Sequence, residues 1–415
     1  MIRDYHLVIT MNMPLREGQL ELSGTQLDEL ERNKDAVIGS LKSASIIAEI
    51  MTPSILINIY GNLFRPDLAQ KTTRLPVKYD ARLPINEQVI SNETAVYVNR
   101  DSLTIKYQDN YVSCLPYSVK KFPVEWMGSA NGELTGAFFN RIQRIACPFI
   151  ITMCIHIPDQ TSAASKAQNN MLRATQMKDT DVGKYVPQWK GRHADWTYVV
   201  GCMDQGSRLI RASYQIVLFA PQGTEQGCEQ SLRNVFSANG WNLVKDRFCT
   251  VPRVMSSMPM WIGRESFELM DKLKFFSTLL SWNAVNLAPW IAEWKGNVPY
   301  GQDPMLMFLG RRGQVCYLDP FLNTKGNFNI AVAAASGAGK SFFTQDYVKA
   351  ILGSGGKAFI IDSGRSYENL CKILDGEYID FEEGNTICLN PFTTILEEPV
   401  AGGINFSEQL PLLKS

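Results

Sequence analysis

Apolar and polar positions alternate from Tyr5 to Met11, a pattern that predicts a strand near the start of the chain. Apolar residues then recur at helical spacing between Leu27 and Leu41, and a second apolar run extends from Ala44 to Ile50. These segments, all within residues 3–50, predict a β-α-β unit.

The same order of patterns returns over residues 211–249. Arg211–Pro221 predicts a strand, the next helix is expected to begin at its cap Thr224 and to end before Gly240, and Trp241–Val244 begins another strand. Two units of similar order predict an α+β domain that is built in part from duplicated elements, of the ferredoxin-like type.

Other elements are expected between these two units. Thr52-Pro53 is a typical helix start, because the threonine side chain caps free amides and proline fits the first helical position. Ala95–Val98 predicts one of several short strands within residues 65–133. The apolar run Cys147–Ile157 predicts a buried strand, and the polar stretch Thr161–Lys178 predicts a solvent-facing helix.

The pattern changes near residue 300, where Pro299–Asp303 is typical of a linker. A Gly-Arg-Arg-Gly turn then stands between two apolar runs, which predicts a β-hairpin over residues 306–318. Beyond it we expect a strand, a loop, a helix and a second strand, with parallel strands joined by a right-handed crossover. The two strands are expected at Asn327–Ala333 and Ala358–Ile361, and the helix between them at Ser341–Leu352.

A phosphate-binding pattern lies between that strand and that helix. Residues 334–341 match G-x-x-x-x-G-K-[ST], except that Ala334 replaces the first glycine. The run Ser-Gly-Ala-Gly is also common in ordinary turns, but its place between a strand and an amphipathic helix favours nucleotide binding. The candidate nucleotide-binding residues are Ser336, Gly337, Ala338, Gly339, Lys340 and Ser341.

Each position of this loop has a chemical reason. Gly337 and Gly339 allow backbone angles that are closed to other residues, and they let amides approach phosphate oxygens. Lys340 would neutralise the β- and γ-phosphates, and the Ser341 hydroxyl would ligate Mg²⁺ at the helix N-terminus. Alanine disturbs the entry of the loop least if φ is negative at Ala334.

Hydrolysis also requires an acidic strand that holds Mg²⁺ and a residue that orients water. Phe359–Asp362 has the form of such a strand, but it follows the loop helix directly, so we interpret Asp362 as a structural or capping residue. Thr394–Glu398 also has this form, but Pro399 ends it, which favours a solvated turn. We therefore expect no acidic-strand motif, and we identify no catalytic residue, within this chain.

Composition limits the classes of partner and compartment. The 415 residues are 45% hydrophobic and 20% charged, which is typical of a soluble protein with two or three domains. The 41 basic residues balance 41 acidic ones, and only short basic pairs such as Lys120-Lys121 and Arg311-Arg312 stand out. This balance disfavours a motor that grips DNA directly. The nine cysteines form no C-x-x-C pair, which is typical of a reducing compartment.

Two segments bear on membranes. Residues 1–6 contain acidic and aromatic side chains where an export signal needs a basic start, so no export signal is expected. Phe275–Trp294 is apolar but is interrupted by polar residues, which excludes a membrane span by its pattern. Core packing is the favoured interpretation of this stretch, and a docking surface is the alternative.

From Gly301 to Asp380 the sequence resembles the TraC-type ATPases of conjugative type IV secretion systems, and Tyr5–Met11 and Cys147–Met260 resemble that family's N-terminal half more loosely. The segments that carry the likeness are the hairpin turn Gly310–Gln314, the run Asn327–Val332, the loop Ser336–Ser341, the motif Asp362–Tyr367, Leu370-Cys371 and Gly376.

This resemblance implies a P-loop ATPase of the RecA/FtsK-like superfamily that binds ATP and Mg²⁺. It also implies a homo-hexamer or a related oligomer, peripheral to the cytoplasmic face of a bacterial inner membrane, with inner-membrane components of the secretion system as partners. There it would power pilus assembly and the transfer of DNA and protein. The family's proteins extend beyond both ends of this chain, so the resemblance implies a fragment that does not hydrolyse ATP alone.

We therefore predict two domains. Residues 1–298 would form an α+β domain for assembly and docking, and the chain is expected to start inside this domain. Residues 299–415 would form the N-terminal part of an α/β P-loop domain of the RecA-like type. A second hypothesis treats the chain as a non-hydrolysing docking module, in which residues 1–290 bind inner-membrane components and the remainder binds nucleotide weakly or not at all. The aromatic stretch Phe275–Trp294 is its motivation.

Overall fold

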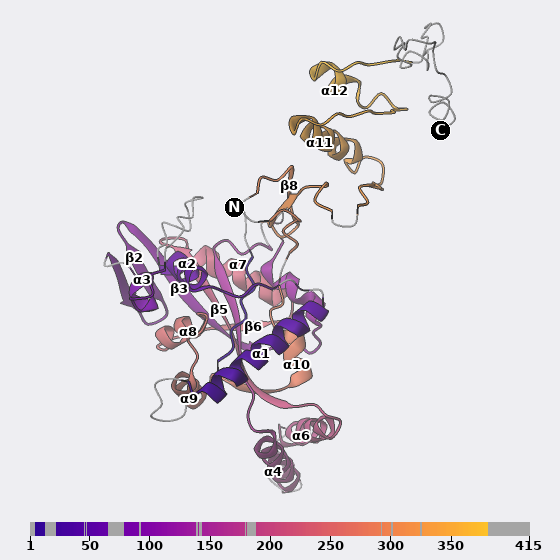
Figure 1. Ribbon diagram of the computed structural model, residues 1–415. Coiled ribbons are helices and arrows are strands. Elements are labelled where there is room, and N and C mark those ends of the chain that lie inside the picture. The colour runs from indigo at the N-terminus through magenta and orange to yellow at the C-terminus, as the bar shows by residue number, and fades with distance from the viewer. Residues whose placement is uncertain are drawn as a thin grey trace, which may run out of the picture. The chain divides into compact units, whose positions relative to one another are not determined.

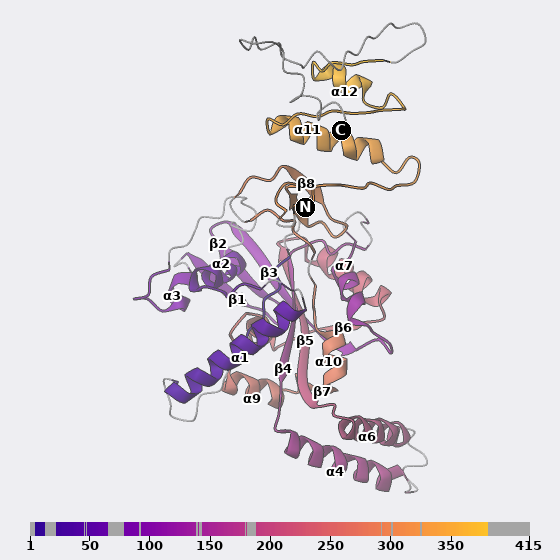
Figure 2. The same ribbon diagram turned by 45° about the vertical axis from the view of Figure 1, so that its right-hand side comes forward.

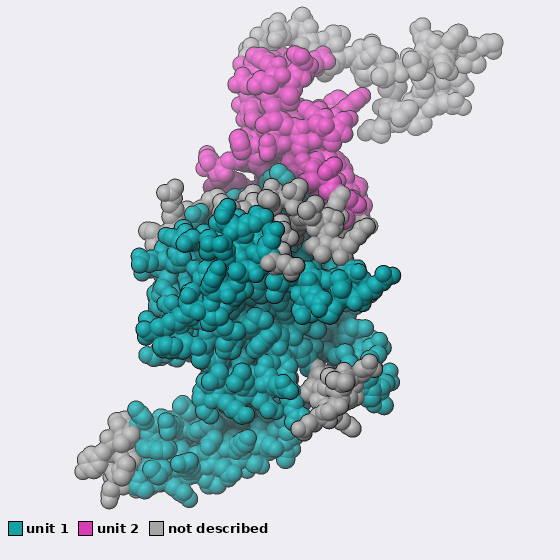
Figure 3. All heavy atoms as spheres, turned by 90° about the vertical axis from the view of Figure 1, so that its left-hand side faces the viewer, with its two compact units in different colours: residues 1–296, 307–317 teal, residues 297–306, 318–415 magenta. Residues whose placement is uncertain are grey.

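The computed structural model divides the chain into two units, residues 1–296 with 307–317 and residues 297–306 with 318–415 (Figure 3). The roles and boundaries expected for the domains at 1–298 and 299–415 stay predictions. The structure describes residues 5–12, 22–44, 46, 48–64, 79–90, 93–137, 140, 143–178, 180, 188–291, 293–299, 302–323 and 326–380.

An antiparallel sheet organises the first unit (Figure 1). Its strand order is β1-β2-β3-β5-β4, β6 pairs with β3, and β7 pairs with β5. The strands are β1 (Thr94–Val98), β2 (Leu103–Tyr107), β3 (Asn110–Lys121), β4 (Phe149–His156), β5 (Leu209–Pro221), β6 (Asn242–Lys245) and β7 (Ser277–Leu280).

The long central strand β3 contains a proline at the one place where its ladder allows it. On one edge β3 pairs with β2 as far as Cys114 and with β6 from Tyr117 onward. Pro116 lies between these two ladders, and its carbonyl accepts a hydrogen bond from the Asp246 amide at 3.0 Å. The missing N–H of proline therefore falls at a gap between partners.

Helices cover both faces of the sheet. The helices of the first unit are α1 (Gly24–Ser43), α2 (Pro53–Phe64), α3 (Ile85–Val89), α4 (Gln160–Lys178), α6 (Gln188–Asp204), α7 (Glu225–Ala238), α8 (Thr250–Ser256), α9 (Arg264–Lys272) and α10 (Ser281–Leu287), with a 3-10 helix at Gly128–Thr135. Along β5, Ile216 and Leu218 pack in the core formed with α7, while Val217 and Phe219 pack in the core formed with α2 and α8. The strand is apolar at consecutive positions because both of its faces are buried.

The helices α4 and α6 pack against each other and connect β4 with β5 (Figure 2). Only the small residues Ala163, Ala167 and Ala174 of α4 are buried, and the rest of this helix is partly or fully exposed. The predicted solvent-facing helix is therefore confirmed. None of the helices in the described ranges combines the length and the apolar character needed to cross a membrane.

Only the second of the two predicted β-α-β units is confirmed. In it β5, α7 and β6 follow in order, and β3 lies between the two strands, since both pair with it antiparallel. Thr224 occupies the N-cap position, although its hydroxyl donates to the Pro221 carbonyl at 2.7 Å rather than capping an amide. Gly240 ends the helix with a φ of 78°.

The first predicted unit is wrong, and so is the duplication. The helix within it is present as α1, but residues 5–12 and the described residues among 44–50 form no strand. Instead of joining a ladder, the Tyr5 amide donates to Oε1 of Gln314 at 2.9 Å, and its hydroxyl donates to the Arg312 carbonyl at 3.1 Å. Period-2 alternation is not sufficient for a strand without a neighbouring strand to pair with.

The apolar stretch Phe275–Trp294 is divided between core and surface. Leu280, Ala284 and Leu287 are buried, which confirms the core interpretation for one side of the stretch. Trp282 is 71% exposed, and other apolar side chains of the stretch, Val285, Trp290 and Trp294, are exposed as well. A role of these exposed side chains in docking stays a prediction.

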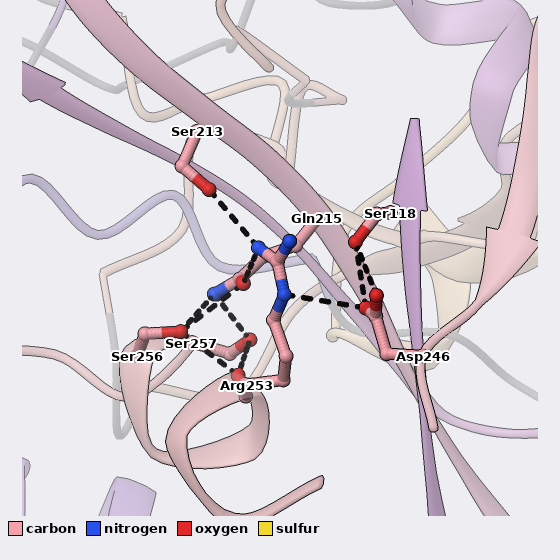
Figure 4. Close-up of polar contacts among 7 residues, drawn as sticks. All are labelled: Ser118, Ser213, Gln215, Asp246, Arg253, Ser256 and Ser257. Atoms are coloured by element: carbon pink, nitrogen blue, oxygen red, sulfur yellow. Dashed lines mark hydrogen bonds and ion pairs between the residues drawn. The ribbon is translucent and has the colours of Figure 1, made fainter. Parts of the chain in front are cut away.

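A largely buried polar network connects α8 with neighbouring strands of the sheet (Figure 4). Arg253, only 4% exposed, donates to Oγ of Ser213 at 3.1 Å and to Oε1 of Gln215 at 3.2 Å. Its Nε lies 3.3 Å from Oδ2 of Asp246, and its guanidinium lies 3.5 Å from the centre of the Phe275 ring. Burial raises the pKa of Asp246 and lowers the pKa of Arg253, so each charge depends on the other.

The remaining described elements are β8 (Leu306–Leu309), β9 (Val315–Leu318), α11 (Lys340–Gly353) and α12 (Glu368–Ile373). The hairpin β8-β9 and the helix α11 confirm their predictions. The strands predicted at Asn327–Ala333 and Ala358–Ile361 are wrong, because neither segment has a ladder partner among the described residues. Phe359 is 95% exposed as a result.

Candidate nucleotide-binding site

The predicted phosphate loop forms a tight turn that leads into α11. The Ala338 amide donates to the Ala335 carbonyl at 3.1 Å, and Gly337 and Gly339 have φ angles of 76° and 90°. A Cβ atom at either glycine would meet nothing within 4 Å, so glycine is needed here for its backbone angle and not for lack of space. The prediction of special angles at both glycines is confirmed.

Alanine is compatible with the entry of the loop. Ala334 is not among the described non-glycine residues that have a positive φ. Replacement of the first glycine of the pattern therefore introduces no backbone strain at this position.

The N-terminus of α11 leaves free amides beside the loop. Gly339 is the N-cap and has no side chain that could cap the helix, and the first helical hydrogen bond runs from the Phe343 amide to the Gly339 carbonyl at 2.9 Å. The amides of Lys340, Ser341 and Phe342 precede this bond and have no acceptor within the helix. Together with the helix dipole, these amides suit an anion.

The candidate residues are consecutive, so the loop brings them together by its own local geometry. The Lys340 side chain is exposed at the first position of α11, and Ser341 follows it half-buried. In the described part of the chain, no group of three or more His, Cys, Asp or Glu side chains could hold a metal ion. The Ser341 hydroxyl and phosphate oxygens are the types of ligand that Mg²⁺ takes at such a loop. The ligand contacts of these residues stay predictions.

Asp362 caps its own loop, as the sequence analysis favours. Its Oδ1 accepts a hydrogen bond from the Gly364 amide, and its Oδ2 accepts one from the Tyr367 amide, each at 2.9 Å. The carboxylate is therefore engaged within the segment that leads into α12. The other acidic candidate, Thr394–Glu398, lies outside the described residues.

A set of contacts that sequence reasoning missed ties this segment to α11. Nε2 of Gln345 donates to the Ser366 carbonyl at 2.6 Å, and the Tyr367 hydroxyl donates to Oγ1 of Thr344. Thr344 and Gln345 lie one turn of α11 beyond Ser341, the last residue of the phosphate-loop motif. No motif marks them, because their role depends on residues about twenty positions away.

The capping role of Asp362 predicts a pH dependence. Hydrogen bonds from the amides of Gly364 and Tyr367 lower the pKa of Asp362 below its ordinary value of 3.8. A lowered pKa in the folded state means that this stabilisation is fully present above the ordinary value and is lost as the pH falls through the folded-state pKa. We expect Asp362→Ala to speed hydrogen exchange of these two amides at neutral pH, and the difference from the wild type to vanish in acid.

Hydrogen exchange of the wild type and of Asp362→Ala, measured between about pH 2 and pH 7, checks this expectation. The matched control is Asp346→Ala, because Asp346 accepts from the Lys349 ammonium on the surface of α11 and touches neither amide. An exchange difference that stayed constant over this pH range would contradict the capping role.

Two family models match separate parts of this chain. A family model described as TraC protein matches residues 1–262, and a model described as TraG P-loop domain matches residues 319–400, which include the phosphate loop. Protein TraC of Escherichia coli (strain K12) is 25% identical over 408 residues, which cover 95% of this chain and 45% of that protein. The chain thus spans slightly less than half the length of this curated relative.

Proposed function

Since this chain belongs to the TraC protein family, we propose that it is the ATP-binding part of an ATPase that powers conjugative type IV secretion. The observation that supports ATP binding is the loop at residues 334–341, with left-handed backbone at Gly337 and Gly339 beside the free amides of α11. The match of residues 319–400 to a P-loop domain supports the same site.

In the proposed site, the amides of the loop and of the first turn of α11 bind phosphate oxygens. The Lys340 ammonium balances charge on the β- and γ-phosphates, and the Ser341 hydroxyl is a ligand for Mg²⁺. Bound Mg²⁺ would neutralise charge on the phosphates during transfer. The Asp362 carboxylate accepts hydrogen bonds within its own loop, which supports the proposal that Asp362 is not the acidic residue that holds Mg²⁺ in the whole protein.

The remaining parts of the proposal concern the whole protein. We propose a RecA-like ATPase domain, a homo-oligomer such as a hexamer, and a peripheral position on the cytoplasmic face of the inner membrane beside other components of the secretion system. Pilus assembly and transfer of DNA and protein are the processes that it would drive. The zero net charge supports a motor that contacts its partners through protein surfaces rather than one that grips DNA.

The exposed aromatic side chains near α10 favour a second candidate function, a docking module that does not hydrolyse ATP. Trp282 and Val285 lie three residues apart on α10, and both are exposed. A Trp282→Ser, Val285→Ser variant that stayed in the membrane fraction as the wild type does would refute docking through this surface.

The proposed function is tested in donor cells whose conjugation depends on this gene. We expect Lys340→Ala in the complete gene product to abolish DNA transfer and pilus formation, because bound phosphates lose their main counter-charge. Lys349→Ala, on the same helix but outside the loop, is the matched control and is expected to transfer normally. Normal transfer by an equally abundant Lys340→Ala protein would refute the proposal.

A further inference from the structure

We propose that Tyr367 and Thr344 are positioning residues, which hold the first turn of α11 in the orientation that binds phosphate and Mg²⁺. This inference rests on the proposed nucleotide binding by residues 334–341. It adds two residues that lie outside the phosphate-loop pattern.

A relay of two hydroxyl groups connects Tyr367 with the first turn of α11. The Tyr367 hydroxyl donates to Oγ1 of Thr344. The Thr344 hydroxyl in turn faces the carbonyl oxygens of Lys340 and Ser341, each at 3.1 Å, and can donate to either. The Thr344 hydroxyl accepts one hydrogen bond and donates another, so the two bonds polarise and strengthen each other. The relay therefore ends on the two residues expected to contact phosphate and metal.

The carbonyl groups that Thr344 holds belong to the peptide units that carry the amides of Ser341 and Phe342. A trans peptide is planar, and its N–H points away from its C=O, so fixing the carbonyl also fixes the direction of the amide. These two amides lie at the N-terminus of α11, before its first helical hydrogen bond. A hydroxyl on the far side of the turn thus orients donors on the phosphate side.

The Tyr367 end of the relay is itself held in place. Its amide donates to the Asp362 carboxylate at 2.9 Å, and the neighbouring Ser366 carbonyl accepts a bond from the Gln345 side chain at 2.6 Å. Since the peptide unit between Ser366 and Tyr367 is held at both its carbonyl and its amide, less conformational entropy is lost when the Tyr367 hydroxyl meets Thr344. The segment 362–367 therefore acts as a brace for the phosphate-loop helix.

Two variants remove one hydroxyl each and keep the size of the side chain: Tyr367→Phe and Thr344→Val. ATP binding to the 415-residue chain is measured by calorimetry in Mg²⁺ and in EDTA. We expect each variant to raise the Kd of ATP in Mg²⁺ by about 5- to 10-fold, the effect of one lost hydrogen bond. The loss is expected to be smaller in EDTA, because the turn that the relay holds carries the proposed metal ligand. The double variant is expected to match either single variant, since both break the same relay.

Two control variants separate positioning from a general effect on folding. Thr344→Ser keeps the hydroxyl and is expected to keep the wild-type Kd. Tyr347→Phe removes a hydroxyl from the same helix outside the relay and is expected to have no effect.

Wild-type affinity in both Tyr367→Phe and Thr344→Val would overturn the inference. Equal losses of ATP affinity in Mg²⁺ and in EDTA would also overturn it, because a merely structural effect does not depend on the metal. An equal loss of affinity in Tyr347→Phe would overturn it as well, because that hydroxyl lies outside the relay. Failure of the wild-type chain itself to bind ATP would refute the proposed function and, with it, this inference.

Discussion

Lys340→Ala is expected to raise the Kd of ATP with Mg²⁺ for the isolated chain by about 100-fold or more. The ammonium is the charged side chain of the loop motif, and it stands at the first position of α11, beside the free amides of the helix. Charge-assisted hydrogen bonds to phosphate are about twice as strong as neutral ones, and a 100-fold change corresponds to roughly 2.7 kcal/mol. Calorimetry or displacement of a fluorescent ATP analogue measures this Kd.

Lys349→Ala is the matched control for this prediction. Lys349 lies on the same helix, and its ammonium is 3.4 Å from Asp346, with both side chains about half exposed. Such a surface pair contributes about 0–1 kcal/mol to stability and none to an anion at the helix N-terminus. A Kd that was the same in wild type and Lys340→Ala would show that the loop at residues 334–341 does not bind the phosphates.

The second large effect concerns folding: Arg253→Met is expected to lower the free energy of unfolding by about 3–5 kcal/mol. The substitution removes the charge that compensates the Asp246 carboxylate, whose side chain is 14% exposed and which also accepts from the Ser118 hydroxyl at 2.6 Å. It also leaves Oε1 of Gln215, a fully buried side chain, with the Ser256 hydroxyl at 3.1 Å as its remaining donor. Urea or thermal unfolding followed by circular dichroism measures the loss.

Arg264→Met is the matched control for Arg253→Met. Arg264 forms an ion pair with Glu268 at 3.2 Å, in which both side chains are more than half exposed, so a loss of about 0–1 kcal/mol is expected. The double variant Arg253→Met, Asp246→Leu is expected to recover part of the stability, because it removes the uncompensated charge as well. Similar losses in Arg253→Met and Arg264→Met would contradict the role assigned to the buried network.

Local patterns predicted several elements well. Signals within a few residues of each other predicted the start of α2 at Pro53, the turn of the hairpin at residues 306–318 and the long strand β5. They also predicted the start of α11 at Ser341, one residue after its observed start at Lys340. Failures occurred where an element needs a distant partner. Tyr5–Met11 alternates as a strand does, but its amide at Tyr5 bonds to a side chain some three hundred residues away.

Residues 334–341 were sufficient to predict the candidate phosphate loop, because eight consecutive residues carry the glycines, the lysine and the hydroxyl that such a site requires, and their geometry is local. The sequence also indicated that Asp362 is a cap, since the amides that the carboxylate binds follow within five residues. The burial of Arg253 beside Asp246 and the contact of Tyr367 with Thr344 became evident from the folded chain alone. These contacts join different strands and helices, and the types of the residues alone do not specify which of many polar side chains become neighbours once the apolar faces are buried.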